Sequence, residues 1–130
     1  MSEQKVKDID WHSWQPTEGA TLLFVVKGER ILLIEKKTGL GKGKVNGPGG
    51  RIEPGETPAA CAVGEIYEEL CITVRDVTEC GQLYFEFTNG YKLHCHVFKS
   101  NDYEGVPTET REAAPLWVET NAIPYERMWE

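Results

Sequence analysis

The sequence has little positive charge. Its 14 lysine and arginine residues are outnumbered by 21 aspartate and glutamate residues, which gives a net charge of −7 at pH 7. Proteins that bind the nucleic-acid backbone depend on clustered positive side chains for most of their affinity. The composition therefore argues against a nucleic-acid polymer as partner. A protein this acidic that handles phosphate compounds needs metal ions to mediate the contact.

Long apolar runs and paired cysteine motifs are also missing. The longest apolar run near the start, Leu22–Val26, is too short to span a membrane. The first ten residues, MSEQKVKDID, lack the apolar segment of a signal peptide. The four cysteines form no C-x-x-C pair, and free thiols are the state expected in a reducing compartment. We therefore expect a cytoplasmic protein without membrane contact.

The length of 130 residues suits one compact domain with its own core. We expect residues 1–130 to form a single domain, in which residues 1–18 are a polar N-terminal extension. The sequence contains no internal repeat and no low-complexity block. We expect a monomer.

Strands dominate the predicted secondary structure. The dipeptide Asn89-Gly90 is a strong hairpin signal, and residues 36–50 form a loop rich in glycine. Residues 100–114 are predicted as a polar loop, and a final helix is expected within residues 121–129. The predicted strands are residues 21–26, 30–35, 73–77, 82–88, 91–99 and 116–118. Together with one firm helix, they predict an α+β class or a mixed sheet flanked by helices.

The firm helix lies in the segment between Gly49 and Ile72. Thr57 can cap its N-terminus with a hydroxyl, and Pro58 then occupies the first turn, where a missing N–H does no harm. Helical spacing predicts a core-facing stripe of Ala59, Ala62, Ile66 and Leu70.

Three glutamates lie on another face of this helix. Glu65, Glu68 and Glu69 occupy positions i, i+3 and i+4, where like charges repel each other by a few tenths of a kcal/mol per pair. A hard divalent cation reverses that sign, because it prefers oxygen ligands. The spacing therefore favours a metal site, although a solvated acidic helix face is the alternative.

The same segment resembles the Nudix box, G-x5-E-x7-R-E-U-x-E-E-x-G-U, where U is an aliphatic residue. Gly50 and Glu56 match its first two fixed positions, and the three helix glutamates match its acidic core. Two positions depart from the pattern, because Gly64 replaces the arginine and Cys71 replaces the last glycine. Neither departure removes an acidic residue.

The resemblance implies a Nudix fold, an α/β/α sandwich with a mixed sheet. It also implies a Mg²⁺ site, with Mn²⁺ as a substitute, held by Glu65, Glu68, Glu69 and a glycine carbonyl, here Gly50 with Gly49 as the alternative. The family often adds an acidic residue from a distant loop. Glu112 fits that place best, with Glu109 as the alternative. Glu68 and Glu112 are both candidates for the general base, and Glu69 completes the expected catalytic set.

Outside the box, the chain looks most like the MutT-like enzymes that hydrolyse oxidised purine nucleoside triphosphates. In that subgroup, the residue matching Asn46 hydrogen-bonds the purine, and the tryptophan matching Trp129 stacks on it. Lys36 matches a pocket lysine, and Glu130 stands near the base-reading acidic residues of the animal enzymes. The structural alternatives are a turn role for Asn46, core packing for Trp129 and a solvated charge for Lys36.

The resemblance therefore implies a Mg²⁺-dependent pyrophosphohydrolase that converts nucleoside triphosphates such as 8-oxo-dGTP to monophosphate and pyrophosphate. One alternative is a Nudix enzyme for another nucleoside diphosphate derivative, such as ADP-ribose or a dinucleoside polyphosphate. A second is a nucleotide-binding module without turnover, which the loss of the box arginine at Gly64 suggests.

Overall fold

The computed structural model describes residues 15–38 and 42–128. A seven-stranded sheet holds most of the strands, and its main path runs in the order β3-β2-β1-β7-β6. Within this sheet, β4 also pairs with β1, and β9 also pairs with β2. The large sheet consists of β1 (Glu18–Lys27), β2 (Arg30–Lys36), β3 (Val45–Asn46), β4 (Gly49–Arg51), β6 (Thr78–Glu86), β7 (Lys92–Ser100) and β9 (Ala113–Glu119). A second, two-stranded sheet pairs β5 (Thr73–Arg75) with β8 (Asp102–Glu104).

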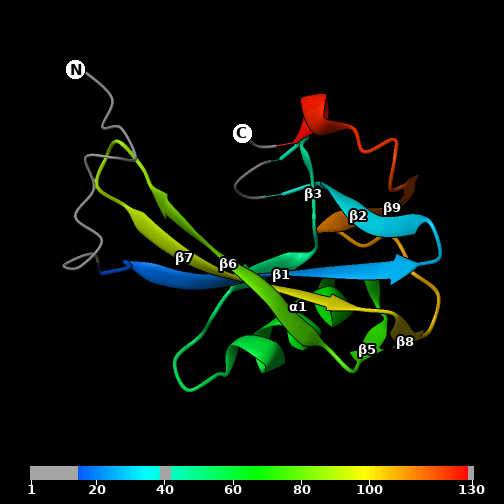
Figure 1. Cartoon of the computed structure of the whole chain (residues 1–130), viewed down its shortest axis with the longest axis horizontal. Helices are drawn as coiled ribbons and strands as arrows, with labels where there is room; N and C mark the ends of the chain where they lie inside the picture. Colours follow the sequence, from blue (N-terminus) through cyan, green and yellow to red (C-terminus); the bar gives the residue numbers. More distant parts are fainter. Residues whose placement is uncertain (1–14, 39–41, 129–130) are drawn as a thin grey trace.

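The large sheet is mixed, because β1 and β7 run parallel while its other pairs are antiparallel. In Figure 1, β1 crosses the centre of the molecule and helix α1 (Pro58–Leu70) lies below it. The β6–β7 hairpin projects away from the half that holds β2 and β9. This arrangement leaves β1 and β4 at the junction between the two halves.

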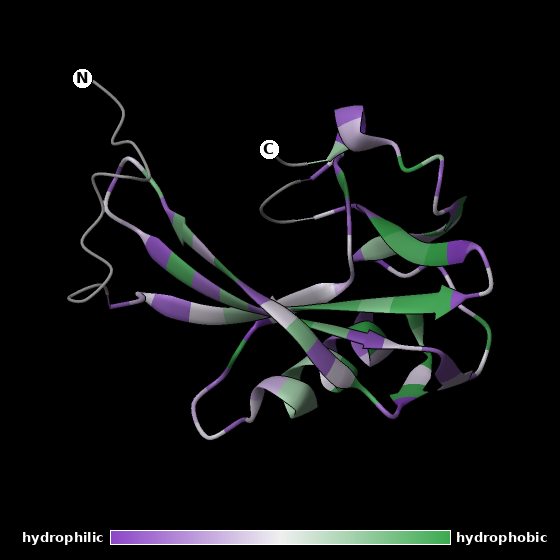
Figure 2. Ribbon diagram, in the orientation of Figure 1, coloured by the Kyte–Doolittle hydropathy of each residue, from purple (hydrophilic) through white to green (hydrophobic). Residues whose placement is uncertain are grey.

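The core lies between α1 and the sheet. Alternate residues of β1, including Leu23 and Val25, are fully buried toward the helix, as the period of a strand requires. Figure 2 shows the hydrophobic residues concentrated along β1 and β2 on this side, whereas the β6–β7 hairpin mixes polar and apolar positions. The helix contributes Ala62, Ile66 and Leu70 to the same core cluster.

The predicted start of α1 is confirmed. The Thr57 hydroxyl accepts a hydrogen bond from the Ala60 N–H at 3.1 Å, and Pro58 is the first helical residue. The predicted hairpins are also confirmed, since β1 pairs with β2 and β6 pairs with β7 around Asn89-Gly90. Within the described residues, no helix has the length and apolar character that crossing a membrane requires.

Three local predictions were wrong. The predicted loop of residues 36–50 contains the short strands β3 and β4, and the predicted polar loop of residues 100–114 contains β8. Strands of two or three residues carry too little periodicity to be recognised in sequence. The final helix is a single 3-10 turn, η2 (Tyr125–Arg127), and since none of its residues is buried, tertiary packing does not offset the cost of helix nucleation.

Cys71 ends α1 in a left-handed conformation, with φ 62° and ψ 30°. A side chain in this region costs roughly 1 kcal/mol that glycine avoids. Because Cys71 is exposed, Cys71→Gly loses no packing, and we expect it to raise the free energy of unfolding by about 0.5 kcal/mol. Denaturant unfolding measures the change. The matched control, Cys80→Gly in strand β6, should lower stability instead, and equal effects of the two substitutions would contradict the argument.

Candidate active site

A cleft of about 530 Å³ opens beside β4, at the junction between the two halves of the sheet. Its walls come from strands β1 and β4, the ends of β2 and β3, helix α1, the β6–β7 hairpin and the loop before β9. Among the residues predicted for the site, those that line the cleft are Lys36, Asn46, Gly50, Glu65, Glu69 and Glu112.

Glu69 joins three of these segments. Its side chain is buried, and its Oε1 accepts a hydrogen bond from the Gly49 N–H of β4 at 2.9 Å. Its backbone carbonyl accepts a second hydrogen bond, from the Thr110 hydroxyl, at 2.7 Å. The carboxylate is therefore held in one orientation at the wall of the cleft, against the glycine strand.

Glu65 lies against Gly50. A Cβ atom added to Gly50 would lie 2.5 Å from the Glu65 carboxyl carbon and 2.6 Å from its Oε2. Only glycine leaves room for the carboxylate so close to this backbone. The Gly50 carbonyl accepts a long hydrogen bond from the Thr21 hydroxyl at 3.5 Å. The Glu65 carboxylate and the Gly50 backbone therefore lie in contact at the wall of the cleft.

The other predicted acidic residues differ in position. Glu68 is exposed on α1 and does not line the cleft, although its charge reaches Glu65. Glu112 lines the cleft and also acts on Glu65. Glu109, the alternative to Glu112, is paired with Lys37 at 2.6 Å and lies outside the lining. Glu56 accepts a hydrogen bond from the Glu53 N–H at 3.0 Å, which is a loop-ordering role.

The electrostatics of the cleft show uncompensated negative charge. Burial raises the pKa of Glu69 to about 8, and Glu65 and Glu112 add to the rise, while the Gly49 N–H and Lys36 oppose it. Burial also raises the pKa of Glu65 to about 7, and repulsion from Glu68 and Glu112 adds to it. Both carboxyl groups therefore resist ionisation until a cation compensates their charge.

The predicted substrate residues are only partly within the described residues. Lys36 and Asn46 both line the cleft. The Asn46 Oδ1 accepts a hydrogen bond from the Gly47 N–H at 2.8 Å, so this side chain has a turn role and keeps its amide NH₂ as a donor. Trp129 and Glu130 lie outside the described residues.

The sequence interpretation missed the contribution of the β6–β7 hairpin. Phe85, Phe87, Tyr91 and Leu93 line the cleft, as does Arg51 at the end of β4. Alternation was the available signal, because residues two apart on a strand share one face. The pairs Phe85–Phe87 and Tyr91–Leu93, on either side of the hairpin turn, have that spacing.

A second hollow, of about 600 Å³, lies at the other end of β1 and is lined by Val26–Gly28, Asp76, Thr78 and residues 99–101. None of the predicted site residues lines it. The cleft beside β4 is therefore the better candidate despite its slightly smaller volume.

The profile of the NUDIX domain matches residues 16–130, which is most of the chain. The chain belongs to the Nudix family. Oxidized purine nucleoside triphosphate hydrolase of Danio rerio is 41% identical over 110 residues, covering 84% of this chain and 70% of the relative. The protein of the same name from Mus musculus is 36% identical with the same coverage.

Solved Nudix structures have the same fold. The MutT NUDIX hydrolase from Burkholderia pseudomallei superposes with a TM-score of 0.77 at 25% identity, covering 85% of this chain and 88% of the other. The MutT protein from Bacillus halodurans gives a TM-score of 0.74 at 25% identity, covering 85% and 74%. The predicted Nudix fold with a mixed sheet is thus confirmed.

Nudix hydrolases generally use divalent metal ions. Within residues 15–38 and 42–128, no three histidine, cysteine or acidic side chains are grouped as a complete metal site. A Mg²⁺ ion does not need one, since it keeps several waters and takes one or two carboxylates. Glu65, Glu69 and the Gly50 carbonyl fit that requirement, because the Glu65 carboxylate fills the space that a Cβ would take at Gly50 and is repelled there by Glu68 and Glu112.

The departure from the Nudix box at Gly64 leaves open space. The residue is exposed on α1, and an added Cβ would meet no atom within 4 Å. A longer side chain could therefore occupy this position without displacing the core. The absent arginine removes a positive charge next to Glu65, in keeping with the raised pKa of that carboxyl group.

Proposed function

We propose that this Nudix protein is a Mg²⁺-dependent pyrophosphohydrolase of oxidised purine nucleoside triphosphates such as 8-oxo-dGTP. The products are the nucleoside monophosphate and pyrophosphate. The names of the Danio rerio and Mus musculus relatives support this substrate class. A monomer in the cytoplasm, acting in sanitation of the nucleotide pool, completes the proposal.

One observation carries most weight. A single cleft contains two carboxylates whose pKa values are raised, together with an amide side chain and an aromatic wall. The acidic part, Glu65 and Glu69 with Gly50, suits a phosphate-bound cation. Asn46 can donate from its amide to a base, and Phe85 and Phe87 present apolar faces to a flat ring. A nucleotide is the ligand that needs both parts.

Each part of the cleft has its own role in this reaction. Glu65, Glu69 and the Gly50 carbonyl hold the ion, which when bound neutralises phosphate charge and lowers the pKa of water. Glu112, or Glu68 as the second candidate, accepts the proton of the attacking water. Lys36 contributes positive charge to the same cleft. Asn46 and Trp129 orient the base, with Glu130 near its polar edge.

A substrate panel tests the proposal. Purified protein with Mg²⁺ is given 8-oxo-dGTP, dGTP, ADP-ribose and a dinucleoside polyphosphate at equal concentrations, and the released products are quantified. We expect the highest kcat/KM for 8-oxo-dGTP, with pyrophosphate as a product. Faster turnover of ADP-ribose or the dinucleoside polyphosphate would assign a different Nudix activity. Tight nucleotide binding by calorimetry without turnover would assign a binding module.

Two neighbouring glutamates provide a matched test of the base. We expect Glu112→Gln to lower kcat about 100-fold, because a positioned general base contributes at least that much. Glu109→Gln should change kcat less than twofold, since Glu109 pairs with Lys37 away from the cleft. Steady-state kinetics at pH 8 gives both values. If Glu112→Gln remains fully active, Glu68→Gln becomes the variant that should lose activity.

A further inference from the structure

The cleft has few positive side chains for a ligand that carries several negative charges. Within the described part of the chain, its cationic lining residues are Lys36 and Arg51. Lys36 acts on the buried Glu69 and lowers its pKa. Arg51 follows Gly50 directly on β4, so its backbone adjoins the proposed phosphate end of the cleft.

Arg51 is held by a weak partner. It forms an ion pair with Glu18, with 3.0 Å between the Arg51 Nε and the Glu18 Oε2, and the side chains of the two residues are 58% and 38% exposed. An ion pair with this exposure contributes little stability, because water screens it. A phosphate group can bind a guanidinium through two parallel hydrogen bonds, which is a stronger arrangement. A phosphate group is therefore a stronger partner for Arg51 than Glu18 is.

Tyr91 also favours a change of partner for Arg51. Its hydroxyl is buried, and no described atom lies in full hydrogen-bond geometry with it, which is an uncommon and costly state. The Arg51 guanidinium lies over the Tyr91 ring, 6.0 Å from its centroid. Burial raises the pKa of Tyr91, and Glu18, which acts on the hydroxyl both as an acceptor and through its charge, adds to the rise, while Arg51 opposes it. Glu18 is thus the nearby acceptor for this hydroxyl, but its carboxylate is already paired with Arg51.

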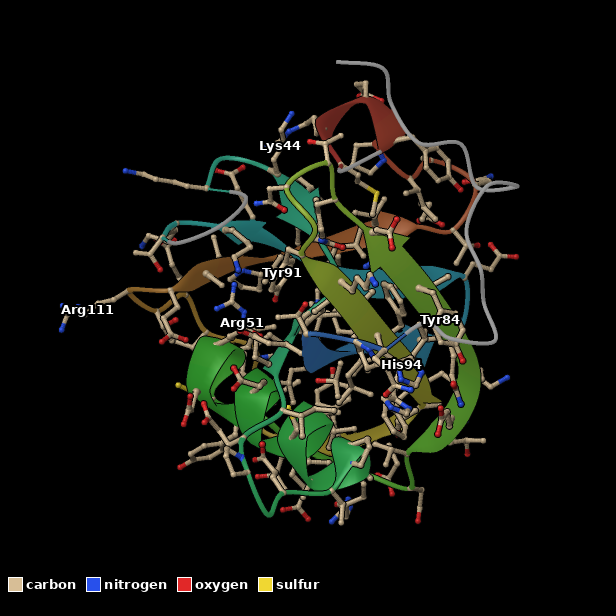
Figure 3. The ribbon with its side chains drawn as sticks, turned by 90° about the vertical axis from the view of Figure 1, so that its left-hand side faces the viewer. Lys44, Arg51, Tyr84, Tyr91, His94 and Arg111 are labelled. Carbon is tan, nitrogen blue, oxygen red and sulfur yellow. The ribbon has the colours of Figure 1, made fainter. Side chains whose placement is uncertain are left out.

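Strand pairing brings these three residues onto one face. Arg51 is opposite Ala20 in the β1–β4 pair, and Glu18 is opposite Leu93 in the β1–β7 pair. Glu18 and Ala20, two apart on β1, share a face, as do Tyr91, directly before β7, and Leu93 within it. Figure 3 shows Arg51 and Tyr91 next to each other, well apart from the labelled Tyr84 and His94.

We propose that Glu18, Arg51 and Tyr91 form a phosphate-dependent exchange: a phosphate group of the ligand takes Arg51 from Glu18, and the released Glu18 carboxylate accepts the Tyr91 hydroxyl. Arg51 is the residue that contacts the ligand, and Glu18 and Tyr91 are positioning residues. The inference rests on the proposed function, because it places phosphates in this cleft. It makes binding depend on the number of phosphates rather than on the base.

Calorimetry with two probes tests the exchange on the full chain with Mg²⁺. Inorganic pyrophosphate reports the phosphate contact, and the nucleoside 8-oxo-deoxyguanosine reports the base contact alone. We expect Arg51→Ala to raise the Kd for pyrophosphate about tenfold, as loss of a charged hydrogen bond requires, and to leave nucleoside binding unchanged. Arg51→Lys should lie between, because lysine keeps the charge but not the paired donors.

The positioning residues give effects of opposite sign. Glu18→Gln should lower the Kd for pyrophosphate about threefold, because Arg51 is no longer paired with a charge, whereas Tyr91→Phe should raise it about threefold, because Glu18 loses its new donor. The matched control is Arg30→Ala. Arg30 forms a similar exposed ion pair, with Glu119 at 3.5 Å, but lies outside the cleft lining. The Kd of Arg30→Ala for pyrophosphate should therefore stay within twofold of the wild type.

The outcomes separate the exchange from the proposed function. If Arg51→Ala binds pyrophosphate as tightly as Arg30→Ala while the wild type hydrolyses nucleoside triphosphates, the exchange is wrong and the proposed function stands. If Glu18→Gln weakens pyrophosphate binding as much as Arg51→Ala, Glu18 merely supports Arg51, and the exchange is again wrong. If the wild type binds neither pyrophosphate nor any nucleoside triphosphate, both are overturned.

Discussion

Glu69→Gln is expected to lower kcat/KM for the nucleoside triphosphate about a thousandfold, while the metal-free protein becomes more stable at pH 8. Activity falls because an uncharged amide is a poor substitute for a carboxylate that compensates a cation. The fold should survive, because glutamine retains an Oε1 that can accept the Gly49 N–H, the 2.9 Å hydrogen bond of the native side chain. Steady-state kinetics with Mg²⁺ measures the loss.

The gain in stability follows from the pKa of Glu69. Burial raises it to about 8 in the folded protein, whereas the unfolded chain has an ordinary glutamate near 4.5. Between these two values the folded state binds more protons than the unfolded state, so its stability falls as pH rises. The stabilisation that protonated Glu69 gives the folded state is fully present below about pH 4.5 and is lost above about pH 8. Glu65, with a pKa raised to about 7, adds to the same trend.

Glutamine removes this titration. We expect Glu69→Gln to match the wild type at pH 4.5 and to exceed its free energy of unfolding by about 2 kcal/mol at pH 8 without metal, a value reduced from the full shift to allow for screening. Denaturant unfolding across this pH range, in the presence of a chelator, gives the comparison. Glu126→Gln, an exposed substitution on η2, should show no such difference.

Opposite changes in activity and stability exclude a simple folding defect. If Glu69→Gln were both inactive and less stable at pH 8, its carboxylate would be a structural group rather than a metal ligand. If it remained active, the assignment of the helix glutamates to the ion would be wrong.

Local sequence features predicted the acidic part of the site well. Helix α1 and its three glutamates lie within one segment, so their relative positions follow from helix geometry alone. Even here burial differs: Glu69 is buried, Glu65 is half-buried and Glu68 is exposed. The helix period gives the face, whereas the position of β4 against that face decides which carboxylates enter the cleft.

The remainder of the cleft depends on long-range pairing. Arg51 and Tyr91 are 40 residues apart in sequence, and they meet because β4 and β7 both pair with β1 and Tyr91 directly precedes β7. No local pattern specifies that β1 and β7 run parallel, since the choice depends on how the intervening chain crosses the sheet. For the same reason, the pairing of β5 with β8 was invisible in a segment that reads as a polar loop.

The largest stability effect is expected at Gly49, which lies opposite Leu22 in the β1–β4 pair. A Cβ atom added there would lie 1.9 Å from the Thr21 carbonyl oxygen and 2.8 Å from its carbon. Both are backbone atoms, so no rotation of a side chain can relieve the overlap. Strand β4 would have to separate from β1, which also breaks the hydrogen bond from the Gly49 N–H to Glu69.

We therefore expect Gly49→Ala to lower the free energy of unfolding by about 4 kcal/mol, a large share of the total for a domain of this size. Thermal unfolding should show a fall in Tm of roughly 15 °C. Gly50→Ala should cost less stability, because its Cβ meets the movable side chain of Glu65, 2.5 Å from the carboxyl carbon. It should still lower activity by displacing that carboxylate.

Gly64→Ala is the matched control, because the same change is made where an added Cβ meets nothing within 4 Å. Alanine is the better residue inside a helix, so this variant should gain about 0.5 to 1 kcal/mol. The expected order of stability is therefore Gly64→Ala, wild type, Gly50→Ala and Gly49→Ala, from highest to lowest. If the free energy of unfolding of Gly49→Ala lies within 1 kcal/mol of the wild-type value, β4 does not pack against β1 as closely as described. The placement of Glu65 and Glu69 beside β4 would then be wrong as well.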